Sequence, residues 1–394
     1  MTPRILIIAG SDSGGGAGIQ ADTKTVTMLG GHAMTAITAI TAQNTLGVQA
    51  VLPVPAGMVV AQINSVVTDI GIDAIKIGMI GSGETANAVA DVLAGMKVPI
   101  VFDPVMLATS GDALADAATI AAFGRLMRLA TVATPNLPEL VALGGGAAVL
   151  AHGCALLVKG GHGDGGKIVD RLIQPDGAEA CWGADRIDTS STHGTGCTLA
   201  SAIATNLARG LPLKAAVARA RQFVRLALHD APGFGGGHGP MGHHKVRLDL
   251  GPDPRLNQVT IPTEDYTASC AFYTALGLNQ IVATEDAHYA RFESPGGATL
   301  SVEKGARPTV FFECEDLDAA VDRLQRAGVT FDQLPTEQSW LWREARLTDP
   351  SGNAVCLYQA DENRRYPPWR LGAFSEKVGT GFSSENATTK DSDA

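Results

Sequence analysis

The sequence lacks paired cysteines, an excess of positive charge and any long apolar run. Its six cysteines are scattered, with no CxxC pair and no metal-ligand spacing, which predicts a reduced, cytosolic protein rather than a disulfide scaffold. Acidic residues outnumber basic ones by 40 to 30, and the net charge of −10 disfavours nucleic acid or an anionic membrane as a partner. No run of 18 apolar residues occurs, and the first residues lead directly into an expected strand, so neither a membrane span nor a signal peptide is expected.

Two phosphate-binding motifs are also missing. No GxxxxGK[ST] occurs, and the glycine-rich segment 9–18 is not a clean GxGxxG, so neither a Walker-type loop nor a dinucleotide fold is supported. What the chain does have is a globular composition, with 45% hydrophobic and 18% charged residues. Its 394 residues are enough for two or three domains.

Buried strands alternate with amphipathic helices over the first 230 or so residues, which predicts an α/β domain with a mostly parallel sheet. The expected strands are 4–10, 74–80, 99–106, 131–135 and 155–160, with 167–173 and 178–184 as an antiparallel edge. The expected helices are 58–70, 84–96, 116–130, 138–143, 198–209 and 214–231.

The pattern changes after residue 232, where a Gly- and His-rich segment predicts a loop. From Arg255 onward, two similar units each contain a strand, a helix and three more strands. The helices 266–276 and 317–327 are expected to stop at Gly277 and Gly328. We therefore predict a smaller α+β domain of two βαβββ units. The expected bounds are 1–245 for the first domain, 246–254 for a linker, 255–360 for the second domain and 361–394 for a tail, disordered at its end.

The segment THGTGCT (192–198), which precedes an apolar helix, is the strongest candidate for an active-site element. Gly194 and Gly196 permit close backbone approach to a ligand, and the N–H groups that open the helix can stabilise a transferring phosphoryl group. The helix end is expected to lower the pKa of the Cys197 thiol, which makes this side chain a candidate general base. The alternative is an ordinary helix start with a packed cysteine.

Eight segments in this order resemble the bifunctional hydroxymethylpyrimidine and phosphomethylpyrimidine kinase family over roughly residues 1–245. They are AGSDSGGGAGIQADTKT, TAITAQNTLGV, KIGMI, VFDPVM, TPNLPE, VKGGH, THGTGCTLASAIA and GHGP. This family belongs to the ribokinase-like superfamily. The resemblance implies phosphorylation of a small pyrimidine alcohol and of its monophosphate in thiamine biosynthesis, using ATP and Mg²⁺, by a homodimeric enzyme.

The resemblance also implies roles for matching residues, and in-line phosphoryl transfer as the chemistry. Catalysis would involve Cys197 with the backbone N–H groups of Gly194, Thr195 and Gly196. The substrate would contact Gly10, Asp22, Gln43, Met79 and Val105. The nucleotide would contact Lys159, Asn136 and Thr195. Mg²⁺ would lie near Asp103 and Glu139, held largely through water or phosphate. Ordinary core packing for Met79 and Val105, a solvated helix-start acid at Glu139 and a strand-edge lysine at Lys159 are the alternatives.

Residues 255–360 resemble the vicinal-oxygen-chelate superfamily of glyoxalase and bleomycin-resistance proteins, through LNQVTIPTEDYTASCAFYTALGL, DLDAAVDRLQRAGV and LTDPSGNAVCLYQ. The positions that bind metal in the superfamily's enzymes read Gln258, Ser301, Thr309 and Cys356, so no catalytic metal is expected. A small-molecule pocket, a dimerisation or regulatory module and metal-free chemistry all stay open. A pocket would be lined by Phe311, Phe312, Trp340 and Trp342, for which core and edge packing is the alternative.

Two other functions compete with the pyrimidine kinase. A pyridoxal or pyridoxine kinase also phosphorylates an aromatic hydroxymethyl heterocycle, but Gln43 within TAQNTLGV favours the pyrimidine, because an amide can donate and accept at once. Alternatively, the chain could act chiefly as a small-molecule binding protein through its second domain. The intact GTGC motif, Lys159 and Asp103 argue against an inactive first domain.

Overall fold

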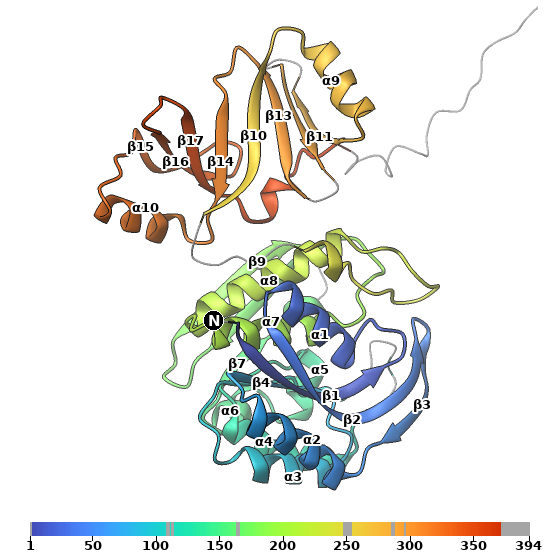
Figure 1. Cartoon of the computed structure of the whole chain (residues 1–394). Coiled ribbons are helices and arrows are strands. Elements are labelled where there is room, and N and C mark those ends of the chain that lie inside the picture. The colour runs from blue at the N-terminus through green and yellow to red at the C-terminus, as the bar shows by residue number, and fades with distance from the viewer. Residues whose placement is uncertain are drawn as a thin grey trace, which may run out of the picture. The chain divides into compact units, whose positions relative to one another are not determined.

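The computed structural model describes residues 2–107, 111, 114–162, 166–246, 254–284, 288–294 and 297–371. The chain forms two compact units, Met1–Leu250 and Gly251–Ala394, and each is considered by itself (Figure 1). Most of the expected linker and the end of the expected tail lie outside the described residues. Among the residues that are described, no helix is both long and apolar enough to cross a membrane.

The first unit is built on a nine-stranded sheet in the order β3-β2-β1-β4-β5-β6-β7-β8-β9. The six central strands, β2, β1, β4, β5, β6 and β7, run parallel to one another. At one edge β3 pairs antiparallel with β2, and at the other β8 pairs antiparallel with both β7 and β9. The bounds are β1 (Arg4–Asp12), β2 (His32–Asn44), β3 (Gly47–Pro53), β4 (Ala74–Ile77), β5 (Ile100–Phe102), β6 (Val132–Ala133), β7 (Ala155–Val158), β8 (Lys167–Ile173) and β9 (Glu179–Asp185). The mostly parallel sheet and its antiparallel edge at β8 and β9 are confirmed.

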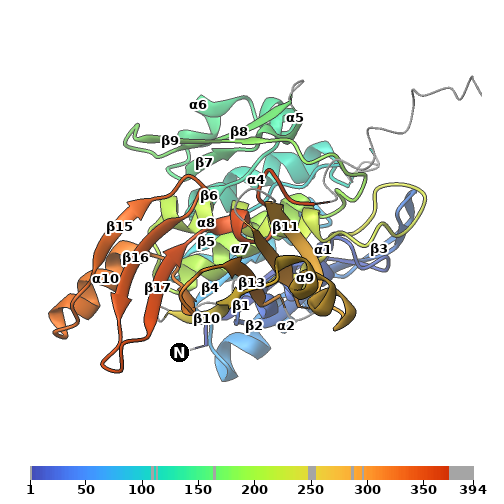
Figure 2. The same cartoon turned by 90° about the horizontal axis from the view of Figure 1, so that it is seen from above.

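Helices cover both faces of this sheet (Figures 1 and 2). One face carries α1 (Gly18–Met28), α7 (Thr195–Ala208) and α8 (Leu213–His229). The other carries α2 (Ala56–Asp69), α3 (Gly83–Leu93), α4 (Ala117–Leu129), α5 (Leu137–Ala142) and α6 (Gly146–Leu150). Because both faces are covered, strand residues such as Ile5 and Leu6 are buried on either side, as in other parallel sheets.

Four elements of the first unit, α1, β2, β3 and α6, were not expected from the sequence. Helix α1 reads GIQADTKTVTM, and its threonines are poor helix formers. Strand β2 alternates small residues, HAMTAITAITAQN, so it buries alternate positions without the large apolar side chains that mark a strand. Helix α7 begins at Thr195 rather than at the expected Thr198, which places Cys197 inside its first turn.

The second unit contains an eight-stranded sheet in the order β11-β12-β13-β10-β14-β17-β16-β15. Its first half comprises β10 (Arg255–Thr263), α9 (Tyr266–Ala275), β11 (Asn279–Thr284), β12 (Tyr289–Glu293) and β13 (Thr299–Lys304). Its second half comprises β14 (Thr309–Glu313), α10 (Leu317–Arg326), β15 (Gln333–Glu337), β16 (Arg343–Thr348) and β17 (Ala354–Gln359). The two βαβββ units of an α+β fold are confirmed.

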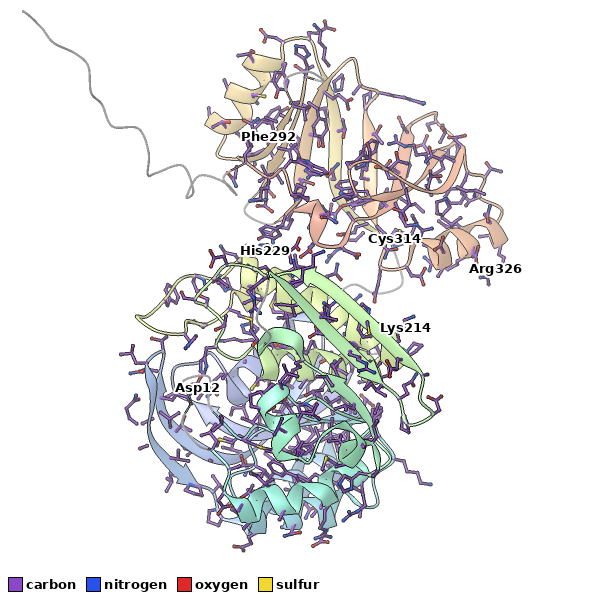
Figure 3. All side chains as sticks on the ribbon, turned by 180° about the vertical axis from the view of Figure 1, so that it is seen from behind. Asp12, Lys214, His229, Phe292, Cys314 and Arg326 are labelled. Atoms are coloured by element: carbon purple, nitrogen blue, oxygen red, sulfur yellow. The ribbon has the colours of Figure 1, made fainter. Side chains whose placement is uncertain are left out.

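Glycines end both helices of the second unit, since Gly277 and Gly328 adopt φ values of +94° and +89° that other residues rarely reach. Both helices cover one face of the sheet. Phe292 packs beneath α9, and Cys314 belongs to the apolar cluster beneath α10 (Figure 3). Neither helix covers the opposite face of the sheet, which carries the alternate side chains of the strands.

Candidate active site

A cavity of about 710 Å³ lies in the first unit, a size suited to a small organic ligand. It opens where β1, β4, β5 and β7 end and α7 begins, which is where open α/β sheets bind ligands. Most residues expected from the sequence line it: Gly10, Gln43, Met79, Asp103, Val105, Asn136, Glu139, Lys159, Gly194, Thr195, Gly196 and Cys197. Asp22 is not among the residues that line it, but its buried carboxylate pairs with Lys76, which does line it.

The two glycine-rich segments meet at the start of α7. Gly194 caps this helix with a φ of +83°, and a Cβ added there would lie 2.0 Å from the Gly16 carbonyl oxygen. Gly10 likewise makes room for Met79, whose Cε would be 2.5 Å from an added Cβ. Close packing of backbone on backbone thus holds the first turn of α7 against the cavity. Its free N–H groups form an anion-binding end.

Cys197 is half-buried in this first turn. Burial raises the pKa of its thiol to about 11, and the charge of Lys76 offsets only part of that effect. The expectation of a lowered pKa was therefore wrong. Loss of hydration outweighs the helix end, and the carboxylates of Asp22 and Asp103 raise this pKa further. At neutral pH the side chain is a thiol.

Asp22 and Lys76 form an ion pair behind Cys197. The Lys76 ammonium lies 2.7 Å from the Asp22 carboxylate, and the Ser201 hydroxyl donates to the other carboxylate oxygen at 2.7 Å. Burial alone would lower the pKa of Lys76, but the negative charges of Asp22 and Asp103 raise it above its usual value. Lys76 lines the cavity, so Asp22 can influence the electrostatics of the cavity through this lysine.

Asp103 and Lys159 form a second ion pair. Lys159 Nζ and the Thr134 hydroxyl donate to Asp103 Oδ1 at 2.7 and 2.9 Å, while Oδ2 faces Gly196. Burial alone would lower the pKa of Lys159, but Asp103 and Glu139 raise it. This ammonium therefore stays charged beside the start of α7.

Asn136 and Glu139 hold each other at the start of α5. Glu139 accepts the Asn136 backbone N–H at 2.8 Å, and Asn136 accepts the Glu139 N–H at 2.9 Å. Burial raises the pKa of Glu139, the negative charge of Asp103 adds to the rise, and Lys159 opposes it. The buried carboxylates of Asp103 and Glu139 thus both lie close enough to the Lys159 ammonium to raise its pKa. Such hard oxygen donors fit Mg²⁺.

Asp12 and His193 form a hydrogen-bonded pair next to the Gln43 amide. Asp12 accepts backbone N–H groups from Gly14 and Ala17, and lies 3.0 Å from His193 Nε2. Burial alone would raise the pKa of Asp12, but the hydrogen bonds from His193 and the two backbone groups lower it. An ionised Asp12 requires a proton on His193 Nε2.

Gln43 lies beside this pair. Its amide nitrogen is 3.3 Å from His193 Nε2, whose one proton is donated to Asp12, and its amide oxygen is 3.1 Å from the Thr41 hydroxyl. The Thr41 hydroxyl also lies 2.9 Å from the Ser11 carbonyl oxygen.

Several cavity residues were missed from the sequence. Asp12, Lys76 and His193 lay within quoted motifs without assigned roles, while Arg221 and Arg225 are four residues apart and therefore on one face of α8. This four-residue spacing was the feature of the sequence that could have identified the two arginines as neighbours. Apolar residues line the same part of the cavity: Ile168, Ala184, Ile187, Val224 and Leu228.

Of the four aromatic residues expected to line a pocket in the second unit, only two lie in the same cluster. Phe311 and Trp342 share a buried cluster, whereas Phe312 packs beneath α10 and Trp340 is 40% exposed. Over the described part of the chain, no group of three His, Cys, Asp or Glu is placed to hold a metal. Gln258 accepts a hydrogen bond from Thr299 at 2.8 Å. The lack of a catalytic metal stays a prediction.

Comparison with known proteins gives two matches along the chain. Residues 12–242 match the family described as phosphomethylpyrimidine kinase, and residues 255–357 match the glyoxalase/bleomycin resistance protein/dioxygenase superfamily. A hydroxymethylpyrimidine/phosphomethylpyrimidine kinase of Streptomyces coelicolor is 48% identical over 61% of this chain and 94% of its own length.

Solved structures resemble the first unit as well. The pyridoxal kinase of Staphylococcus aureus, in complex with AMP-PCP and pyridoxal, is 31% identical with a TM-score of 0.56, over 62% of this chain and 94% of that one. A phosphomethylpyrimidine kinase of Clostridium difficile 630 is 36% identical with a TM-score of 0.51, over 58% and 99%. The match over residues 12–242 spans more than half of the sequence, so the chain belongs to the phosphomethylpyrimidine kinase family.

Proposed function

We propose that the first unit transfers the γ-phosphoryl group of ATP to 4-amino-5-hydroxymethyl-2-methylpyrimidine and then to its monophosphate, in thiamine biosynthesis. The convergence of Gln43, Cys197 and Lys159 on one cavity carries this proposal. An amide suited to a pyrimidine edge, a proton acceptor and a phosphate-binding cation are thereby available within one site. The Streptomyces relative has the same activity in its name.

The residues of this chain would position the groups and neutralise charge. Gln43 reads the pyrimidine edge, with Gly10, Met79 and Val105 around the ring. Lys159 and Asn136 hold the nucleotide phosphates, and the N–H groups of Gly194, Thr195 and Gly196 stabilise the transferring phosphoryl group. These assignments rest on the shared cavity and on the family resemblance.

Cys197 would take the proton of the attacking hydroxyl, and Asp22 would keep Lys76 charged beside it. This arrangement requires the thiol to lose its proton, which its raised pKa disfavours at neutral pH. Asp103 and Glu139 would hold Mg²⁺, largely through water or phosphate. When bound, Mg²⁺ neutralises phosphate charge.

Pyridoxal is the second candidate substrate, because the pyridoxal kinase of Staphylococcus aureus has the same fold. The test is a set of reactions with MgATP and either the pyrimidine alcohol or pyridoxine, analysed by product mass. The pyrimidine kinase gives a monophosphate followed by a diphosphate, and Cys197→Ala slows both. Phosphorylation of pyridoxine alone would assign the chain to vitamin B6 salvage, and no product in either tube would contradict kinase function.

Domain bounds, location and assembly complete the proposal. The kinase domain would span 1–245 and the second domain 255–360, joined by 246–254 and followed by the tail 361–394. Six unpaired cysteines support a cytoplasmic enzyme. Exposed Leu46 and Leu52, next to β3 and within it, support a homodimer that covers them. Light scattering of the full chain tests this assembly, since a monomeric mass would contradict it.

A further inference from the structure

The carboxylate of Asp170 on β8 is held by two groups at the wall of the kinase cavity. Asp170 lines this cavity and is only 8% exposed. Its Oδ1 accepts the backbone N–H of Gly160 at 2.9 Å, and its Oδ2 accepts Nε–H of Arg221 on α8 at 2.6 Å. Because both oxygens are engaged by the protein, this carboxylate is suited to holding other residues in place.

The hydrogen bond to Gly160 acts on the residue before it, Lys159. The Lys159 N–H donates to the Pro135 carbonyl at 3.3 Å, and the Gly160 N–H donates to Asp170. The backbone of Lys159 is thus held both at its own N–H and at the N–H that follows it. Its ammonium lies 2.7 Å from Asp103 in the cavity. A shift of this backbone would move the ammonium with it.

Gly160 allows the two segments to approach this closely. A Cβ added to it would lie 2.1 Å from the carbonyl oxygen of Val169, the residue before Asp170. The backbone that follows β7 therefore packs directly on the backbone of β8. This contact brings the Gly160 N–H within direct reach of the Asp170 carboxylate.

Arg221 fixes the carboxylate from the side of α8. The side chains of Arg221 and Asp170 are only 12% and 11% exposed, so salt and water screen their attraction weakly. The Arg221 Nη2 also donates to the Trp182 carbonyl at 3.3 Å, and the guanidinium carbon lies 5.9 Å from the centre of the Trp182 ring. These contacts with β9 hold the arginine in the orientation that pairs with Asp170.

We propose that Asp170, oriented by Arg221, is a positioning residue for Lys159 in nucleotide binding. This inference rests on the proposed function, in which Lys159 holds the nucleotide phosphates. The contacts run from α8 through β8 to the residue after β7, so these elements together set the place of the phosphate-binding cation. Without Asp170, the Lys159 backbone loses one of its two restraints, and the ammonium no longer stays aligned with the phosphates.

Calorimetric titration of the full chain with MgATP, without a phosphate acceptor, tests the proposal. Asp170→Ala should weaken MgATP binding about tenfold. Asp170→Asn has the same shape and keeps an oxygen for the Gly160 N–H, so its loss should be smaller, about threefold. The control Arg171→Met removes the adjacent residue, whose ion pair with Glu179 is about half-exposed, and should bind as the wild type does. Wild-type affinity in the Asp170 variants, or an equal loss in Arg171→Met, would overturn the proposal.

A double-mutant cycle separates positioning from a general loss of structure. In Lys159→Met the cation is absent, so adding Asp170→Ala should weaken MgATP binding by less than about twofold further. If the two losses multiply instead, Asp170 acts by another route and the proposal fails.

The same titrations distinguish this inference from the proposed function. Absence of MgATP binding by the unsubstituted chain would contradict the kinase function itself. Weakened binding by Lys159→Met, together with unaltered binding by Asp170→Ala, would contradict the positioning role alone.

Discussion

The ammonium of Lys76 and the carboxylate of Asp22 lie 2.7 Å apart, and neither side chain is exposed to solvent. This ion pair joins strand β4 to helix α1, and the hydrogen bond from Ser201 adds helix α7. The start of α7 is thereby tied to the sheet through charges that water does not screen. The arrangement places a permanent positive charge beside Cys197.

Removing one partner of this pair should destabilise the protein. Asp22→Asn leaves the Lys76 ammonium buried without compensation, and the free energy of unfolding of the first unit should fall by about 3–5 kcal/mol. Urea denaturation measures this loss. Asp73→Asn is the control, because its ion pair with Arg4 is half-exposed and should contribute less than about 1 kcal/mol. Equal effects of the two substitutions would refute a special role for the buried pair.

Kinase activity should rise with pH through Cys197. Its pKa of about 11 means that the reactive thiolate becomes more abundant as pH increases from 6.5 towards 9. The kcat/KM for the pyrimidine should therefore increase by up to about tenfold per pH unit, until another step limits the rate. Cys197→Ala should lower kcat by about 10²–10⁴-fold and remove this slope. The same slope in both enzymes would exclude Cys197 as the titrating group.

Gly194 should be irreplaceable for a steric reason. In Gly194→Ala the new Cβ would meet the Gly16 carbonyl at 2.0 Å, so the start of α7 must shift. A displacement of this size should lower kcat about a hundredfold. Gly153→Ala is matched in φ, +87° against +83°, but has open space around it. It should lose stability and keep its kcat, and comparable loss of kcat in both variants would point to backbone strain alone.

His193 should act on substrate affinity rather than on the phosphoryl transfer. In His193→Asn the contact with Gln43 is lost, so the amide is free to turn. The KM for the pyrimidine should rise about tenfold, the equivalent of one hydrogen bond, while the KM for ATP changes less than about twofold. Steady-state kinetics measure both KM values, and the exposed His32→Asn is the control. A larger change in the KM for ATP would place His193 in the nucleotide site instead.

Local sequence patterns predicted the parts of the fold that depend on neighbouring residues. The stops at Gly277 and Gly328 and the apolar periodicity between them were enough for the two βαβββ units. The glycine-rich start of α7 was evident as well. Strand β2 was missed because its alanines and threonines bury little apolar area, and its position depends on pairing with β1.

Long-range contacts explain what the sequence could not predict about the site. His193 meets Asp12 across a separation of 181 residues, and no spacing rule joins them. The pKa of Cys197 depends on burial and on charges brought by β4 and by the residue after β5. Considering only its own helix end therefore gave the wrong direction.

A competition between substrates tests the central claim most directly. The pyrimidine alcohol and pyridoxal are supplied together at equal concentration with MgATP, and phosphorylated products are separated by mass over time. We predict a ratio of kcat/KM of at least about tenfold in favour of the pyrimidine, with the monophosphate preceding the diphosphate. A product mixture dominated by pyridoxal phosphate would contradict the assignment.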